Sequence, residues 1–353
     1  MLFRPITFRS VTARNRIALS PMCQYCARDG VPDDWHLAAL GQRAVGGGGI
    51  VFTEATAVEP RGRISHGCLG LYNDDQQRGF ERIARFVAGQ GAVPGIQLGH
   101  AGRKASVTEP WNGNRPLTAD EDPWAAIAPS PVAFDDGYPA PQEMDRATIA
   151  QVTDAMAAAV RRAREAGFQV VEVHAAHGYL GHEFLSPLSN RRSDDYGGSL
   201  ENRTRFVREM AAAARSEWPA DLPLFLRLSC TDWVEGGWDL EQSVWLAQQL
   251  AAGGEVDLVD CSSGGLHPAQ KIALGPGYQA PFAQAVRERA GIATAAVGLI
   301  TEAAQANAIL EAGQADLIMV GRAYLRDPYL PLRFAADLGV DLDWPVQIAR
   351  GKR

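Results

Sequence analysis

Residues 169–175 read QVVEVHA, a short valine-rich run that follows a long helical stretch at residues 146–165. The same unit, a helical stretch and a short β-type run in alternation, recurs almost to the C-terminus, and we count eight strands and eight helices. The short runs are apolar on both faces, as strands are when they lie between a barrel interior and a shell of helices. The alternation predicts a parallel sheet with helical crossovers.

The expected strands cover residues 17–22, 49–55, 93–99, 169–175, 224–229, 256–262, 294–299 and 316–321. The expected helices cover residues 36–45, 75–88, 146–165, 200–217, 240–252, 280–289, 301–311 and 328–338. These units predict an α/β fold, a closed (β/α)8 TIM barrel, and we expect residues 1–353 to form one domain. An open doubly wound sheet is the alternative, but no GxGxxG follows the first strand.

Two connections are longer than ordinary turns: residues 100–145 after the third strand and residues 177–199 after the fourth. Both follow the carboxyl ends of strands, where barrel enzymes build their active sites. We expect these extended loops to form walls or lids over a pocket.

Composition limits the class of protein and its partners. Apolar residues make up 46% of the chain and charged residues 21%, as in ordinary soluble globular proteins. A net charge of −7 gives no basic field for a nucleic-acid partner. The first ten residues, MLFRPITFRS, lack the apolar run of a signal peptide, and no stretch is apolar enough to span a membrane. These two observations, together with five scattered cysteines, favour a cytoplasmic location and no membrane partner.

The segment VEVHAAHGYLGHEF, residues 171–184, carries the clearest chemical signal. His174, His177 and Tyr179 emerge together at the end of the fourth strand. Two neutral imidazoles can donate hydrogen bonds to one carbonyl oxygen, and a phenol can deliver a proton to carbon. The arrangement indicates reduction of an α,β-unsaturated carbonyl compound.

A metal-dependent hydrolase or lyase on a TIM barrel is the alternative, because His-x-x-His can bind a metal ion. Further ligands would then be needed at neighbouring strand ends, where Cys23, Gln97 and Arg227 stand instead, so we expect no metal. The other interpretations are two structural histidines on a surface loop, or a ligand-binding or scaffold protein without catalytic activity. A glycosidase would need paired acids, and only Glu54 and Asp260 are candidates.

Cys23 and Cys26 have the spacing of a redox or zinc motif but lack its context, since no second cysteine pair completes a tetrahedral site. We expect Cys23 at the barrel mouth, where its thiol can touch a cofactor ring, and Tyr25 with its hydroxyl in the pocket. An isolated cysteine is more often a small apolar core residue.

The last two strands end in glycines at the place where many barrels bind phosphate. Gly298 follows the seventh strand, and Gly321 with Arg322 follows the eighth. Gln97 and Arg227 fall where the barrel mouth could hold a planar ring with hydrogen-bonding edges, although a buried arginine can also be a plain salt-bridge partner.

Five segments together resemble the Old Yellow Enzyme family, specifically its thermophilic-like class. They are residues 20–25 (SPMCQY), 96–104 (IQLGHAGRK), 173–203 (from Val173 through HAAHGYLGHEFLSPLSNRRSDDYGGSLENR), 226–228 (LRL) and 320–322 (VGR) with Asp327 and Pro328. The match spans the chain, and its longest segment is highly specific.

The resemblance implies an NADPH dehydrogenase, or ene-reductase, that holds FMN and takes hydride from NADPH or NADH in a ping-pong cycle. It implies FMN contacts from Ser20, Pro21, Met22, Cys23, Ala55, Gln97, Arg227, Gly298, Gly321 and Arg322. Arg227 would stabilise charge on the reduced ring, and Cys23 would tune its redox potential.

Substrate contacts implied by the resemblance are Tyr25, His174 and His177, with Tyr179 or water as the proton donor. The substrates would be α,β-unsaturated carbonyls, maleimides and nitroalkenes.

The resemblance also implies a role for the C-terminal tail, residues 340–353. In this class an arginine from a neighbouring subunit reaches the active site, and Arg350 matches it. Ile348 and Lys352 stand where the class carries aromatic residues. We expect a homodimer or homotetramer in which Arg350 contacts the substrate of a second subunit.

Overall fold

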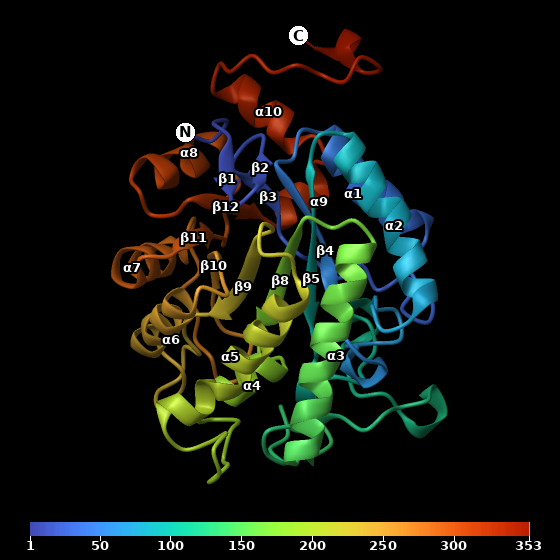
Figure 1. Cartoon of the computed structure of the whole chain (residues 1–353), viewed down its shortest axis with the longest axis vertical. Helices are drawn as coiled ribbons and strands as arrows, with labels where there is room; N and C mark the ends of the chain where they lie inside the picture. Colours follow the sequence, from blue (N-terminus) through green and yellow to red (C-terminus); the bar gives the residue numbers. More distant parts are fainter. Residues whose placement is uncertain (353) are drawn as a thin grey trace.

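The computed structural model describes residues 1–352 and contains a closed barrel of eight parallel strands with helices around it (Figure 1). The order around the barrel is β10, β11, β12, β3, β4, β5, β8, β9. Its strands are β3 (Ile17–Leu19), β4 (Ile50–Ala57), β5 (Val93–Gly99), β8 (Val170–Ala175), β9 (Leu224–Ser229), β10 (Leu258–Ser262), β11 (Ala293–Ala296) and β12 (Leu317–Val320). The predicted (β/α)8 barrel is confirmed.

The surrounding helices are α1 (Asp34–Val45), α2 (Asp74–Gly89), α3 (Arg146–Glu165), α5 (Leu200–Glu217), α6 (Leu240–Gly253), α7 (Ala280–Ala290), α8 (Ala303–Glu311) and α10 (Leu330–Asp337). Side chains of Asp145, Ser199 and Asp239 accept backbone hydrogen bonds at the starts of α3, α5 and α6. Such caps satisfy N–H groups that a helix start leaves free, so these helices begin where the sequence predicts. Two short helices, α4 (Leu180–Leu185) and α9 (Arg322–Arg326), were not expected.

An N-terminal hairpin, β1 (Ile6–Phe8) and β2 (Val11–Ala13), packs against the barrel interior and was not predicted. Phe8, Val11 and Ala13 belong to the same apolar cluster as Phe52, Val170, Phe225 and Leu258 from the barrel strands. The rings of Phe8 and Phe225 meet edge to face, with centroids 5.1 Å apart. Because these strand residues lie near the amino ends of their strands, the hairpin closes the barrel opposite its carboxyl ends.

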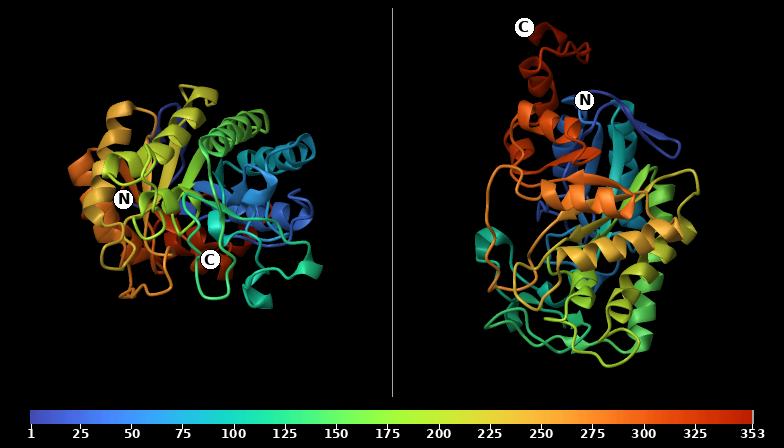
Figure 2. Two further views of the ribbon diagram at one scale, coloured as in Figure 1. Left: turned by 90° about the horizontal axis from the view of Figure 1, so that it is seen from below. Right: turned by 90° about the vertical axis from the view of Figure 1, so that its left-hand side faces the viewer.

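The two long connections carry short elements. The loop after β5 contains the 3₁₀ helices η2 (Gly102–Lys104), η3 (Pro110–Asn112) and η4 (Ala119–Glu121) and a small sheet of β6 (Ile127–Ala128) and β7 (Gln142–Glu143), and the loop after β8 contains α4. The right-hand view of Figure 2 shows both loops at the end of the molecule opposite the two chain termini. No helix among the described residues is long and apolar enough to cross a membrane.

Beyond α10, the tail ends in the 3₁₀ helix η5 (Ala349–Gly351), well away from the long loops (Figure 1). The last position of the predicted tail, residue 353, lies outside the described residues.

Candidate active site

Four neighbouring strands place a polar layer inside the barrel, above the apolar cluster closed by the hairpin. Gln97 on β5 pairs in register with Glu172 on β8, and Arg227 on β9 pairs with Asp260 on β10. The second pair is offset from the first by two residues along β8, because Arg227 pairs there with His174. Alternate residues of a strand share a face, so Glu172 lies on the same inward face as Val170 below it and His174 above it. All four side chains of the layer are buried.

The polar layer is held by two pairwise contacts. Gln97 Nε2 donates to Glu172 Oε1 at 2.7 Å. Arg227 Nε lies 2.9 Å from Asp260 Oδ2, and this ion pair is the only polar contact of the Arg227 side chain with the described residues. Burial and the nearby Asp260 raise the pKa of Glu172 to about 8, and burial also raises the pKa of Asp260.

Above this layer, at the end of β8, the structure brings the predicted histidines and tyrosine together. The ring centroid of His174 lies 5.3 Å from that of His177 and 5.1 Å from that of Tyr179. His174 Nδ1 accepts the Ala176 backbone N–H at 3.1 Å, so the proton of the neutral ring is on Nε2. His177 Nε2 lies 2.7 Å from the hydroxyl of Ser262 on β10. The group therefore offers N–H and O–H donors around one point.

The electrostatic surroundings keep these three side chains uncharged. Burial, and after it the positive charge of Arg227, lowers the pKa of His174 and of His177 well below 6.5. Burial raises the pKa of Tyr179 well above 10. Two imidazoles and a phenol can thus act as neutral hydrogen-bond donors at neutral pH, and the adjacent cation disfavours a metal ion at the histidines.

A network that was not identified in the sequence holds the loop carrying His177 and Tyr179. Lys104 Nζ donates to the carbonyl oxygens of His177, at 2.8 Å, and Gly265, at 2.9 Å. Gly178 N–H donates to His182 Nδ1 at 3.0 Å, and His182 Nε2 lies 2.7 Å from Asp232 in a fully buried pair. His177 has a left-handed φ of 60°, which a non-glycine residue keeps only where its surroundings fix it. One signal was available, since Lys104 is one of only three lysines and follows the segment that carries Gln97.

Cys23 and Tyr25 lie near Tyr179, because all three pack against one small apolar cluster in the loops above β4 and β5. Tyr25 meets Trp111 edge to face, with ring centroids 5.8 Å apart. A hydrogen bond with Cys68, together with burial, raises the pKa of the Cys23 thiol. Cys23 therefore has Cys68 as its thiol neighbour, and sequence spacing to Cys26 gave no sign of this.

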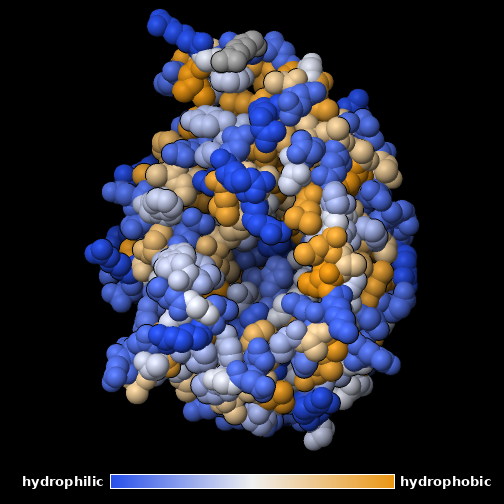
Figure 3. Space-filling model, turned by 180° about the vertical axis from the view of Figure 1, so that it is seen from behind, coloured by the Kyte–Doolittle hydropathy of each residue, from blue (hydrophilic) through white to orange (hydrophobic). Residues whose placement is uncertain are grey.

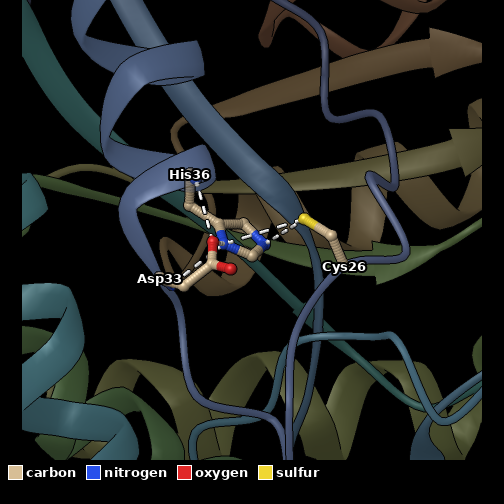
Figure 4. A group of neighbouring side chains, drawn as sticks. All are labelled: Cys26, Asp33 and His36. Atoms are coloured by element: carbon tan, nitrogen blue, oxygen red, sulfur yellow. Dashed lines mark hydrogen bonds and ion pairs between the residues drawn. The ribbon is translucent and has the colours of Figure 1, made fainter.

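Cys26 points elsewhere, toward His36 at the start of α1 (Figure 4). Its sulfur lies 3.6 Å from His36 Nε2, while Asp33 lies 2.7 Å from Nδ1 and Glu54 3.3 Å from Nε2. Cys26, Asp33 and His36 are close enough together to be tested as metal ligands, but both ring nitrogens already have protein partners. A register shift in β4 between Phe52 and Ala55 accompanies this outward position of Glu54, which therefore does not join Asp260.

A cavity of about 290 Å³ opens at the ends of β10, β11 and β12. It is lined by residues that include Ser262, Gln279, Gly298, Leu299, Gly321, Arg322 and Arg326. A side chain at Gly298, where φ is 116°, would meet Gln279 Nε2 at 2.8 Å, so this position requires glycine. Gln279 and Arg326 were not predicted. Figure 3 shows a hollow near the centre of one face, with hydrophilic side chains on its floor.

The other predicted cofactor contacts also lie at strand ends. Ser20 N–H donates to the carbonyl of Val320 at 3.0 Å, which fixes the segment of Pro21 and Met22 beside β12. Ala55 pairs in register with Gln97. Arg350 is exposed in η5 and makes no hydrogen bond or ion pair with a predicted site residue of its own chain, judged over residues 1–352.

This arrangement fits FMN on two structural grounds. Apart from its ion pair, the buried guanidinium of Arg227 has no acceptor among the described residues, and a planar ring with carbonyl groups would supply one. The cavity beside Gly298 and Gly321 combines glycine backbone with the charge of Arg322, as a phosphate group requires.

Comparison with known proteins agrees with this geometry. The model of the NADH:flavin oxidoreductase / NADH oxidase family matches residues 1–340. The chain is 46% identical to an NADPH dehydrogenase of Geobacillus thermodenitrificans, over 100% of this chain and 99% of the relative. It is 45% identical to an NADPH dehydrogenase of Bacillus subtilis, over 99% of this chain and 98% of the relative.

Among solved structures, the chain is similar to an old yellow enzyme homologue from Zymomonas mobilis. The TM-score is 0.80 and the identity 25%, over 98% of this chain and 95% of the other. The chain therefore belongs to the NADH:flavin oxidoreductase / NADH oxidase family, and it is an NAD(P)H-dependent flavin oxidoreductase of the Old Yellow Enzyme type with FMN as cofactor.

Proposed function

We propose that this protein is an ene-reductase, which reduces carbon–carbon double bonds conjugated to a carbonyl or nitro group in a ping-pong cycle. The observation that carries the proposal is the neutral His174, His177 and Tyr179 group at the barrel mouth, above Gln97 and Arg227. Such a group recognises an oxygen atom that gains negative charge during the reaction. The substrates are α,β-unsaturated carbonyls, maleimides and nitroalkenes.

The residues that would hold FMN fall into two sets. Ser20, Pro21, Met22, Cys23, Ala55, Gln97 and Arg227 surround the place of the ring, and Gly298, Gly321 and Arg322 surround the place of the phosphate. FMN held by these residues would supply the transfer of hydride from NADPH or NADH to the alkene. Arg227 contributes a fixed positive charge near the ring, and Cys23 contributes a polarisable thiol that tunes the redox potential.

His174 and His177 bind the substrate oxygen and polarise the conjugated double bond. His174 presents Nε2–H, because its Nδ1 accepts a backbone N–H. Their lowered pKa values keep both rings neutral, so each acts as a hydrogen-bond donor and not as an acid. Tyr25, half-buried beside Trp111, forms a wall of the substrate pocket.

Tyr179 supplies the proton to the α carbon of the substrate, with water as the alternative donor. Its ring lies 5.1 Å from that of His174. A positioned acid of this kind accelerates proton transfer by about 10²- to 10⁴-fold.

The proposed activity and the sequence together indicate the partners and the location. We infer a small-molecule alkene as substrate, no nucleic-acid or membrane partner, a cytoplasmic location, and a homodimer or homotetramer in which Arg350 reaches a neighbouring subunit.

The deciding experiment is anaerobic. NADPH is added to the purified protein, the flavin absorbance is followed, and 2-cyclohexenone is then added. Bleaching followed by recovery supports the proposed function. Bleaching without recovery for enones, maleimides and nitroalkenes alike overturns the ene-reductase assignment. In the matched variant His174→Ala, bleaching by NADPH should persist while recovery becomes slower.

A further inference from the structure

The polar layer contains two carboxyl groups that are not expected to touch any ligand. Glu172 on β8 and Asp260 on β10 are both fully buried, and Arg227 on the strand between them lies beside Asp260. Each acid contacts one of the residues that face the flavin site: Glu172 contacts Gln97, and Asp260 contacts Arg227. Their position is that of a supporting layer beneath the flavin site.

The hydrogen bonds of these two acids are incomplete. Glu172 Oε1 accepts from Gln97, but Glu172 Oε2 has no hydrogen-bond partner, and neither has Asp260 Oδ1. Asp260 Oδ2 has its ion pair at 2.9 Å without hydrogen-bond alignment. Buried polar atoms without partners are costly, and two ionised acids buried around one arginine would be more costly still. A proton on Glu172 would remove one of the two buried negative charges.

The charges around the layer agree with a single proton on its two carboxyl groups. Gln97 from β5 donates to Glu172, and the charges that act on Glu172 are those of Asp260 from β10 and Arg227 from β9. His174, the next inward residue on β8, is kept neutral by burial. With one acid protonated, Arg227 and the remaining carboxylate cancel, and the layer is electrically neutral. The pKa of Glu172, about 8, makes it the protonated partner at neutral pH.

We propose that Glu172 is a neutral acid, and that Glu172 and the ion-paired Asp260 position the residues facing FMN. Glu172 fixes the Gln97 amide by accepting from Nε2, which leaves Oε1 of Gln97 free as an acceptor. Asp260 holds the Arg227 guanidinium in place through its ion pair. Glu172 and Asp260 are positioning residues, and the proposal rests on the assignment of FMN to this site.

Substitution of Glu172 distinguishes a neutral acid from a charged one. In Glu172→Gln the new amide oxygen can accept from Gln97 Nε2, so it replaces a neutral acid at equal charge. Glu172→Leu removes the hydrogen bond with Gln97. FMN is titrated into flavin-free protein, and quenching of flavin fluorescence gives the Kd. We expect Glu172→Gln to stay within about threefold of the unsubstituted protein and Glu172→Leu to bind about tenfold more weakly or worse.

Equal, large losses of affinity in Glu172→Gln and Glu172→Leu would overturn the proposal, because they would mean that the charge of Glu172 matters. If Glu172→Leu does not fold, the Glu172→Gln variant still decides. Glu54→Gln is the matched control, since Glu54 is also a buried acid but faces His36 outside the layer. Its FMN affinity should equal that of the unsubstituted protein.

Infrared spectroscopy of the flavin-free protein tests the proton on Glu172 without FMN. A protonated carboxyl group has its own C=O stretching band, and the difference between the protein and Glu172→Gln at neutral pH should contain that band. Glu183, whose pKa is also raised to about 8, contributes equally to both spectra and cancels. Absence of the band from the difference overturns the proposal. A protein that binds no FMN but shows the band would instead contradict the cofactor assignment.

Discussion

Three histidines of this chain lie in three different surroundings. His174 is buried beside the positive charge of Arg227, and its pKa is lowered. His36 lies between Glu54 and Asp33, which raise its pKa against the effect of burial. His182 is paired with Asp232 in the interior. The role of each ring is set by its neighbours, which come from other elements and are not adjacent in the sequence.

The sequence therefore predicted which side chains would lie at the strand ends, but not their partners. His174, His177 and Tyr179 were identified because they follow directly after a predicted strand. Cys68 beside Cys23 could not be predicted, because the contact depends on how the loop after β4 folds back. Glu172 and Asp260 were visible as strand residues, but their shared layer requires the register of the barrel.

The lowered pKa of His174 predicts a pH dependence of stability. An unfolded histidine titrates near ~6.5, so below that pH the unfolded chain binds a proton that folded His174 does not. The stability is present above the unfolded pKa and is lost as pH falls, by up to about 1.4 kcal/mol per pH unit. The free energy of unfolding is measured with urea in excess FMN at about pH 7.5 and about pH 5.5. Its decrease at the lower pH should be about 1 kcal/mol smaller in His174→Asn than in the unsubstituted protein.

His36→Asn is the control of opposite sign. The raised pKa of His36 contributes stability below the unfolded pKa, and this is lost as pH rises through the folded value. His36→Asn should therefore cost more free energy of unfolding at the acid pH than at the alkaline one. If the free energy of unfolding falls equally between the two pH values in the unsubstituted protein and in His174→Asn, a neutral His174 is contradicted.

Tyr179 should be needed in only one half of the catalytic cycle. Burial keeps its phenol protonated at neutral and mildly alkaline pH, so it can donate a proton to the substrate. Tyr179→Phe should slow reoxidation by 2-cyclohexenone by about 100-fold or more, with reduction by NADPH unchanged, in anaerobic stopped-flow measurements.

Tyr138→Phe is the control, since its hydroxyl donates to the carbonyl of Asn114 instead. Its two rates should match those of the unsubstituted protein. A Tyr179→Phe variant with unchanged reoxidation would assign the proton to water.

At the level of elements, the boundaries of α3, α5, β5 and β9 agree with the prediction at both ends. Apolar runs and cap residues are local features of the sequence, so they can be recognised without knowledge of the tertiary contacts. The β1–β2 hairpin was missed because its strands are only three residues each, which is too short for their alternation to stand out. The register shift in β4 was missed for a related reason: its outward Glu54 is stabilised by His36 on α1, a contact between elements.

The hairpin should matter for stability and not for the flavin site. Phe8 is buried against Phe225 at the closed end of the barrel, and Phe8→Ala should lower the free energy of unfolding by about 3 kcal/mol. Thr7→Ala, on the exposed face of the same strand, should change it by less than about 1 kcal/mol. Both are measured by urea unfolding, and FMN affinity should be the same in both. Reduced FMN affinity in Phe8→Ala alone would show that the two ends of the barrel are coupled.

At the level of the whole molecule, the barrel brings together residues from its two halves. The predicted ring contacts come from β3, β4, β5 and β9, and the predicted phosphate contacts from the ends of β11 and β12. The sequence predicted this gathering because the carboxyl ends of the strands in a closed barrel meet at one mouth. It could not place the tail, whose position depends on contacts outside the barrel.

The tail lies at the end of the molecule away from the long loops, with Arg350 exposed (Figure 1). If Arg350 contacts substrate, it does so in a second copy of the chain. Light scattering should then show a dimer or tetramer, and Arg350→Ala should raise the KM for 2-cyclohexenone while leaving reduction by NADPH unchanged. Mixing Arg350→Ala chains with His174→Ala chains supplies the sharper test. In a mixed oligomer, a site with intact His174 can receive Arg350 from its neighbour, so part of the lost activity should return on mixing. If both variants are separately impaired and mixing restores nothing although subunits exchange, Arg350 acts within its own chain or not at all.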